Sequence, residues 1–131
     1  MIVFDASVLM TLLSSEDFGR PARLAMLEDD VAAPHLIDLE FMSACRNAHR
    51  RSELSEEHAL ELLRRSRLVP IERFRHEPLL PRVWELRDNL TSYDASYVAL
   101  AEALDCPLYT SDGGIAKAPG LAGDVHFVPG G

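Results

Sequence analysis

The sequence predicts an α/β fold, a three-layer α/β/α sandwich around a central, mainly parallel β-sheet. Short apolar runs alternate with longer segments whose apolar residues recur at helical spacing, as in folds of this class. The first run, Ile2-Val3-Phe4, is continuous, which is typical of a strand buried on both faces. The chain has 131 residues, of which 47% are hydrophobic. This supports one packed core, so we expect residues 1–131 to form a single domain.

The expected elements alternate along the chain. Within the helical segments, apolar residues three and four apart form one face. The strands are expected at residues 2–4, 31–33, 68–72, 107–110 and 125–128. The helices are expected at residues 6–14, 20–28, 35–51, 56–67, 78–90 and 91–104, with a further helical turn around residues 115–118.

In the N-terminal half, the element boundaries rest on capping residues and proline. Asp17 is expected to cap the second helix and Ser55 the fourth, because their side-chain oxygens accept hydrogen bonds from free backbone N–H groups. Pro34 closes the second strand. The fourth helix is acidic in its first turn and basic in its last, which complements the helix dipole.

In the C-terminal half, Pro70 falls within the third expected strand. It indicates an edge strand or an irregular pairing, because proline lacks the N–H group that a central strand donates. Thr91 precedes Asp94 by three residues, the spacing of a capping box, and marks the clearest helix start in the chain. Glycines make residues 113–123 rich in loops.

The charge of the chain limits its interactions with nucleic acid. Its formal net charge is −8 and its sequence pI is about 5.0. This argues against strong nonspecific binding through phosphate neutralisation. It does not exclude a nuclease, because cations bound at an acidic site reverse the local field that the substrate meets.

The cysteines indicate a reducing compartment, and the apolar runs indicate neither an export signal nor a membrane span. Cys45 and Cys106 are too few for a disulfide framework, and we expect both to be reduced thiols. The five histidines have no zinc-binding spacing. No basic segment precedes the apolar residues 8–13, and no run approaches the ~18 residues of a membrane span. We therefore expect a cytoplasmic protein without a membrane partner.

Four acidic residues are candidates for a functional site. Asp5 follows the first strand, Asp112 follows the fourth, and Asp94 opens a helix. Each of these three also has an ordinary structural explanation, as a helix cap or as the partner in a capping box. Glu40 lies in mid-helix beside the apolar face, with no cationic residue three or four positions away. It must either reach solvent or have its charge compensated.

Together the four acids predict a metal site. The carboxyl ends of parallel strands lie at one edge of a sheet, where α/β proteins bind ligands, so one crevice can hold all four. Clustered carboxylates raise one another's pKa values unless a divalent cation lies among them. Oxygen ligands without thiolates favour Mg²⁺ or Mn²⁺ over zinc. One or two such ions suit attack on a phosphodiester.

The same residues carry a resemblance to a known family. Matching segments occur in order and spacing: Ile2 to Ser7, then Glu40, Ser92 to Ala95, and Thr110 to Asp112. In these features, and over essentially its whole length, the chain resembles PIN-domain proteins. It is most similar to the small VapC-type toxin ribonucleases of bacterial toxin–antitoxin pairs.

The resemblance implies a PIN-like sandwich and a Mg²⁺-dependent endoribonuclease, with Mn²⁺ as an alternative cofactor. Asp5 and Asp94 would be direct metal ligands, with Glu40 and Asp112 acting through water or a second ion. A metal-activated water would attack the RNA phosphodiester and leave a 3′-hydroxyl and a 5′-phosphate.

Two hydroxyl residues and one loop complete the implied site. Ser7 and Thr110 match positions whose hydroxyls help to hold the acidic site or the substrate phosphate. Gly113-Gly114 departs from the family pattern after Asp112. We therefore expect a mobile loop there and a less fixed fourth carboxylate.

The resemblance also implies partners. Members of the family act on RNA, commonly form homodimers and are silenced by a small VapB-type antitoxin that lies over the active site. The helices at residues 20–28 and 55–67 would form the groove for this antitoxin. The alternative is that their apolar stripes are ordinary core.

Two other functions are alternatives. A non-catalytic PIN-like binding module would keep the acids only as helix caps. Phosphoryl transfer on an aspartate is disfavoured, because Asp5-Ala6-Ser7 lacks the second aspartate of a D-x-D nucleophile motif.

Overall fold

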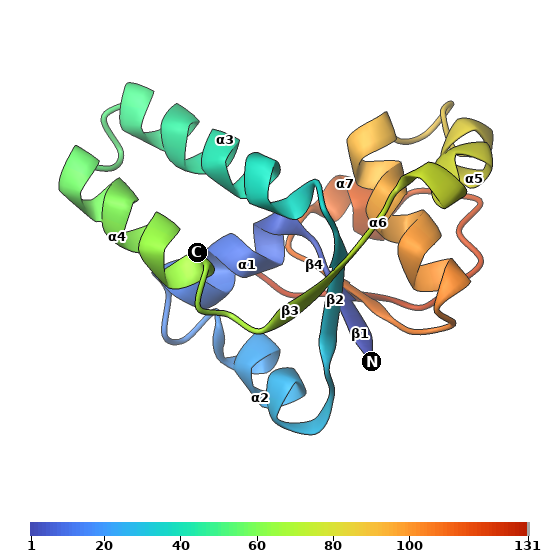
Figure 1. The fold of residues 1–131 in the computed structure, drawn as a ribbon, viewed down its shortest axis with the longest axis horizontal. Coiled ribbons are helices and arrows are strands. Elements are labelled where there is room, and N and C mark those ends of the chain that lie inside the picture. Colours follow the sequence, from blue (N-terminus) through green and yellow to red (C-terminus); the bar gives the residue numbers. More distant parts are fainter. Residues whose placement is uncertain (131) are drawn as a thin grey trace.

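Five parallel strands form one sheet in the computed structural model, which describes residues 1–130 (Figure 1). The strand order is β3-β2-β1-β4-β5. All four neighbouring pairs are parallel. The predicted α/β/α fold is therefore confirmed. The strands are β1 (Ile2–Phe4), β2 (Val31–Pro34), β3 (Ile71–Phe74), β4 (Leu108–Thr110) and β5 (Val125–Phe127).

Helices cover both faces of this sheet. α1 packs against β1 and β4 from one side, and α6 packs against β1, β2 and β4 from the other (Figure 1). Among residues 1–130, no helix is both long and apolar enough to cross a membrane. The helices are α1 (Ala6–Ser14), α2 (Arg20–Glu28), α3 (Ile37–Arg50), α4 (Glu56–Ser66), the 3₁₀-helix η1 (Glu77–Leu79), α5 (Leu80–Glu85), α6 (Ser92–Ala103) and α7 (Gly113–Ala116).

The strand order creates a switch point beside β1. The chain first moves outward from β1 through β2 to β3, and then crosses back to pair β4 with the other side of β1. Right-handed crossovers place the helices of the two halves on opposite faces of the sheet. The carboxyl ends of β1 and β4 therefore lie side by side, where open α/β sheets bind ligands.

The central strand is buried as its continuous apolar run predicted. Ile2, Val3 and Phe4 are at most 2% exposed. β3 is an edge strand, as Pro70 indicated, but it begins at Ile71 and not at Leu68. The N–H of Leu68 is used in the turn that follows α4, where it donates to Arg65. Pairing with β2 starts only after Pro70.

The helix expected at residues 78–90 is shorter than predicted. η1 leads into α5, which ends at Glu85, and the following residues form turns. Backbone hydrogen bonds there are mixed: Asn89 donates to Leu86, three residues back, and Leu90 donates to the same carbonyl, four residues back. Leu86 and Leu90 are nevertheless 3% and 8% exposed. Their burial produces helical spacing in the sequence without a regular α-helix.

Helix starts agree with the predicted caps at two of three positions. Ser55 Oγ accepts a hydrogen bond from the His58 N–H at 3.1 Å, and Thr91 Oγ1 accepts one from the Asp94 N–H at 3.1 Å. The cap predicted at Asp17 is wrong. α2 follows Gly19, and Asp17 accepts the Arg20 N–H through its backbone carbonyl.

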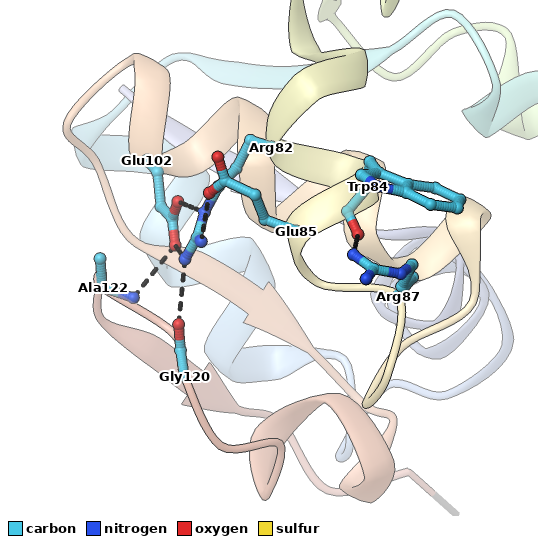
Figure 2. Close-up of polar contacts among 7 residues, drawn as sticks. All are labelled: Arg82, Trp84, Glu85, Arg87, Glu102, Gly120 and Ala122. Atoms are coloured by element: carbon cyan, nitrogen blue, oxygen red, sulfur yellow. Dashed lines mark hydrogen bonds and ion pairs between the residues drawn. The ribbon is translucent and has the colours of Figure 1, made fainter.

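An ion pair between α5 and α6 holds the segment that leads into β5. Arg82 donates from Nε to Glu102 Oε2 at 2.7 Å and from Nη2 to the Gly120 carbonyl at 2.9 Å (Figure 2). Glu102 Oε1 accepts the Ala122 N–H at 3.0 Å. The Glu102 side chain is only 16% exposed, so solvent screens this pair less than it screens surface pairs.

We expect Glu102→Gln to destabilise the protein by about 1–2 kcal/mol at neutral pH, because a charge-assisted pair is lost in a partly buried site. The hydrogen bond from Arg82 lowers the pKa of Glu102 below its usual 4.5. The pair therefore contributes fully above about pH 4.5, and its contribution is lost as pH falls through the folded-state pKa. Thermal unfolding measured from neutral to acidic pH should show the variant approaching the wild type in stability.

The matched control is Glu61→Gln. Glu61 pairs with Arg64 at the same 2.7 Å, but both side chains are about half exposed or more. Because solvent screens this exposed pair, its loss should change stability much less than the loss of the Arg82–Glu102 pair. Equal effects of the two substitutions would show that the Arg82–Glu102 pair has no special structural role.

Candidate active site

The carboxyl ends of β1 and β4 border a pocket of about 440 Å³. All four acids singled out in the sequence line it. Asp5 follows β1, Asp112 follows β4, and Glu40 and Asp94 lie in the first turns of α3 and α6. Four separate elements thus bring carboxylates to one place. The other lining residues are Ala6, Ser7, Met10, Thr11, Ala44, Tyr97, Ser111 and Gly130.

Asp5 is the most buried of the four carboxylates, with 3% of the residue exposed. It caps α1 by accepting the Val8 N–H at 2.9 Å. Ser7 Oγ donates to the same carboxylate oxygen at 2.6 Å, and Thr110 Oγ1 donates to the other. Burial raises the pKa of Asp5 although these three bonds favour the charged form, and the charge of Asp112 raises it further.

Ser7 and Thr110 also fix the segment after β4. Ser7 Oγ accepts the Ser111 N–H at 2.9 Å, and Thr110 Oγ1 accepts the Asp112 N–H at 2.9 Å. Each hydroxyl therefore donates to Asp5 and accepts from the backbone next to β4. This network sets where Asp112 lies relative to Asp5.

Glu40 on α3 and Asp94 on α6 both line the pocket, and both residues are partly buried. Burial is the main cause that raises the pKa of each. The charges of Asp94 and Asp5 raise the pKa of Glu40 further, and the charge of Asp112 does the same for Asp94. Within residues 1–130, neither side chain forms an ion pair.

Asp112 is held more firmly than the sequence indicated. A mobile loop was expected after it, but α7 begins at once at Gly113. Asp112 Oδ1 caps this helix by accepting the Gly114 N–H at 2.7 Å. The capping explanations for Asp5 and Asp112 are thus correct, and both residues line the pocket as well. Capping and site formation are not alternatives here.

Two polar residues of the pocket were missed in the sequence. Thr11 follows Ser7 by one helical turn, and its Oγ1 lies 2.9 Å from Ser111 Oγ. Tyr97 follows Asp94 by three residues on α6, which places the two on one helix face. Extending each acidic or hydroxyl position by one helical turn would have found Thr11 and Tyr97.

The Tyr97 hydroxyl is unusual. The residue is 1% exposed, and within residues 1–130 its Oη is the buried side-chain nitrogen or oxygen atom that has no hydrogen-bond partner. An unmatched buried hydroxyl costs about 1–3 kcal/mol. A ligand that enters the pocket, or a pocket side chain that moves to accept a hydrogen bond from the hydroxyl, removes this cost.

The side chains of the pocket fit a hydrated Mg²⁺ or Mn²⁺ ion. They offer oxygen donors, and no histidine or cysteine lines the pocket. In the described part of the chain, no group of three or more acidic, histidine or cysteine side chains is arranged to hold a metal ion. Mg²⁺ does not need three such ligands, because it keeps several waters and uses one or two carboxylates. A hydrated cation would also relieve the carboxylate repulsion and could meet the Tyr97 hydroxyl.

Two larger pockets, of about 850 and 680 Å³, lie away from the acids. The first is bordered by Arg64, Arg67 and Arg73 with Asp38, and the second lies between α1, α2 and α4. Size therefore does not identify the functional site here. The acidic pocket is distinguished by its convergent carboxylates and perturbed pKa values.

Comparisons with known proteins agree with this fold. A family model described as "PIN domain" matches residues 2–121. Ribonuclease VapC1 of Mycobacterium tuberculosis is 39% identical over 128 residues, which cover 96% of each chain. The crystal structure of PAE2754 from Pyrobaculum aerophilum is 27% identical with a TM-score of 0.66, and covers 87% of this chain and 82% of that one. VapBC2 from Rickettsia felis, bound to a DNA fragment, has a TM-score of 0.67 at 15% identity, and covers 95% and 98%.

We expect Glu40→Gln to stabilise the protein at neutral pH in the presence of EDTA, by about 0.5 kcal/mol or more. The pKa of Glu40 is raised in the folded state, so its protonated side chain contributes fully to stability below the usual pKa of 4.5. This contribution is lost as pH rises through the raised pKa. The gain should therefore vanish in acid, and thermal unfolding across this pH range measures it. Glu57→Gln, on the exposed face of α4, is the control. If the Glu40→Gln variant is no more stable than the wild type at neutral pH, the charge of Glu40 does not destabilise the fold.

Proposed function

The chain belongs to the PIN domain family, and on that basis we propose that it is a metal-dependent endoribonuclease, the toxin of a toxin–antitoxin pair. The observation that carries the proposal is the convergence of Asp5, Glu40, Asp94 and Asp112 on one pocket. The 39% identity with ribonuclease VapC1 supports the choice of RNA as substrate.

In this proposal Asp5 and Asp94 bind Mg²⁺ or Mn²⁺ directly, while Glu40 and Asp112 act through water or a second ion. The bound cation supplies neutralisation of the phosphate charge and a lower pKa for water. Ser7 and Thr110 favour the charged form of Asp5 and orient its carboxylate through their hydrogen bonds. Attack of water on phosphorus breaks the bond to the 3′-oxygen, which leaves a 3′-hydroxyl and a 5′-phosphate.

The helix dipoles of α1 and α6 support phosphate binding at this pocket. α1 and α6 both begin at its rim, after the cap residues Asp5 and Thr91. Free N–H groups and the positive ends of helix dipoles favour an anion there. The formal net charge of −8 opposes RNA elsewhere on the surface, so substrate binding should depend strongly on the cation.

The proposal includes a VapB-type antitoxin in the groove between α2 and α4. Ala22 is the buried residue of α2, whereas Leu24 and Leu27 are 55% and 81% exposed, and Leu60 of α4 is 59% exposed. Leu24 and Leu27 therefore lie outside the core, whereas Ala22 is in the core and Ala25 packs against it. An amphipathic segment of a partner could cover such a surface.

A homodimer is also part of the proposal. A second apolar surface supports it, where Leu80 and Tyr93 line a shallow pocket and are 51% and 60% exposed. Trp84 on α5 is 67% exposed, and the Arg87 guanidinium lies 4.3 Å from its ring centroid (Figure 2). We further propose that the protein acts in the cytoplasm, where its free cysteines, Cys45 and Cys106, stay reduced.

Cleavage of end-labelled total RNA by the purified protein tests the proposal. We expect discrete bands with Mn²⁺ or Mg²⁺, none with EDTA, and a loss of about 100-fold or more in Asp5→Asn and Asp94→Asn. Asp94→Asn should remain folded, because the substitution keeps the size of the side chain. Asp5→Asn also keeps the size but replaces one of the two oxygens that accept hydrogen bonds, so circular dichroism must show that this variant is folded before its activity is compared. Asp17→Asn changes an exposed carboxylate far from the pocket and should cleave like the wild type.

Undiminished metal-dependent cleavage by both site variants would refute the assignment. If the wild type neither cleaves RNA nor binds Mn²⁺ in calorimetry, the acids serve only as caps, and the chain is a non-catalytic PIN-like binding module.

A further inference from the structure

The Tyr97 hydroxyl has no structural task in the folded chain. The ring fills space in the core beneath α6, but the buried Oη atom makes no hydrogen bond within residues 1–130. Phenylalanine would fill nearly the same volume without burying an unmatched polar group. The hydroxyl therefore weakens folding unless a partner reaches it.

Acidic groups surround this hydroxyl. Tyr97 lines the same pocket as the four carboxylates. Its pKa is raised first by burial, then by a hydrogen-bonding interaction with the Glu40 carboxylate and by the charge of Glu40, and further by the charges of Asp5 and Asp94. The phenol consequently stays protonated and can act as a hydrogen-bond donor.

Glu40 is an acceptor in the same pocket that has no hydrogen-bond partner of its own in the described part of the chain. Its carboxylate is close enough to Tyr97 for the hydroxyl to lower its pKa, yet the two groups form no hydrogen bond of ordinary geometry. Within residues 1–130, no hydrogen bond or ion pair to the Glu40 side chain occurs. A donor and an acceptor, both unmatched, thus lie side by side in the pocket.

We propose that Tyr97 is a positioning residue that donates a hydrogen bond to the Glu40 carboxylate when a divalent cation occupies the pocket. The bond fixes the orientation in which Glu40 holds the cation or its water. Both residues line the same pocket, so the bond needs no change in the backbone. This inference rests on the proposed function, because it requires a cation at the acidic site.

The physical reason is the mutual repulsion of the carboxylates. Without a cation, Glu40 gains by keeping away from Asp5 and Asp94, which raise its pKa. A cation removes this repulsion and draws the carboxylate inward. A fixed donor behind the carboxylate then limits its freedom, as hydrogen-bonding partners of metal ligands do in other sites.

The test is Mn²⁺ binding by isothermal titration calorimetry on the full chain without RNA. Tyr97→Phe should lower the Mn²⁺ affinity by about 10-fold, within the range seen for groups that orient metal ligands. Its Tm in EDTA should equal or exceed that of the wild type, because an unmatched hydroxyl is removed. Tyr109→Phe removes a phenol hydroxyl on β4, outside the pocket, and should leave the affinity unchanged.

A double-mutant cycle tests whether Tyr97 acts through Glu40. In a Glu40→Gln background, we expect Tyr97→Phe to cause little further loss of affinity, because the charged acceptor is already gone. Full additivity of the two losses would overturn this route. Equal Mn²⁺ affinities of the wild type and Tyr97→Phe would overturn the inference as a whole.

Failure of the proposed function gives a different result. If the wild type itself binds no Mn²⁺, the metal site is refuted and the inference falls with it. If the wild type binds Mn²⁺ and loses it in Asp5→Asn but not in Tyr97→Phe, only the role of Tyr97 is refuted.

Discussion

The buried carboxylate of Asp5 is the interaction on which the rest of the site depends. Desolvation penalises its charge, and three donors compensate for it: the Val8 N–H, the Ser7 hydroxyl and the Thr110 hydroxyl. These donors come from α1 and β4, so stabilising one charge also joins the ends of two neighbouring strands. Through the same hydroxyls, the segment that carries Asp112 is fixed in place.

The fold gathers charges that disfavour one another. Burial and neighbouring acids raise the pKa values of Asp5, Glu40 and Asp94. The fold holds these repelling carboxylates in place through the hydrogen bonds that start their helices. Asp5 and Asp112 cap helices, and Thr91 caps the helix that bears Asp94. The capping bonds that start these helices also aim their N-termini at the pocket, where a cation and a phosphate would together balance the charge.

Local signals predicted most of the fold, and they failed where tertiary packing took over. The bounds of α1 and α2 follow directly from apolar periodicity, and Ser55 and Thr91 were found from capping preferences alone. Asp17 had the right composition for a cap, but the turn before α2 uses its carbonyl instead. In the segment after α5, burial of Leu86 and Leu90 imitates a helical pattern, because packing rewards apolar contact whatever the backbone conformation.

The sequence by itself determined the α/β class and singled out Asp5, Asp94 and Asp112, because strand-end carboxylates and capping spacings are local patterns. Glu40 was singled out as a helical carboxylate with no cationic residue three or four positions away. The family resemblance pointed to Ser7 and Thr110. Only the tertiary structure decided that all four acids face one pocket, that both hydroxyls bond to Asp5, and that Tyr97 lies buried beside Glu40 without a partner. These facts join residues about a hundred positions apart, such as Ser7 and Thr110. Hydrogen-bond satisfaction across such separations depends on how the helices pack on the sheet, which no local pattern encodes.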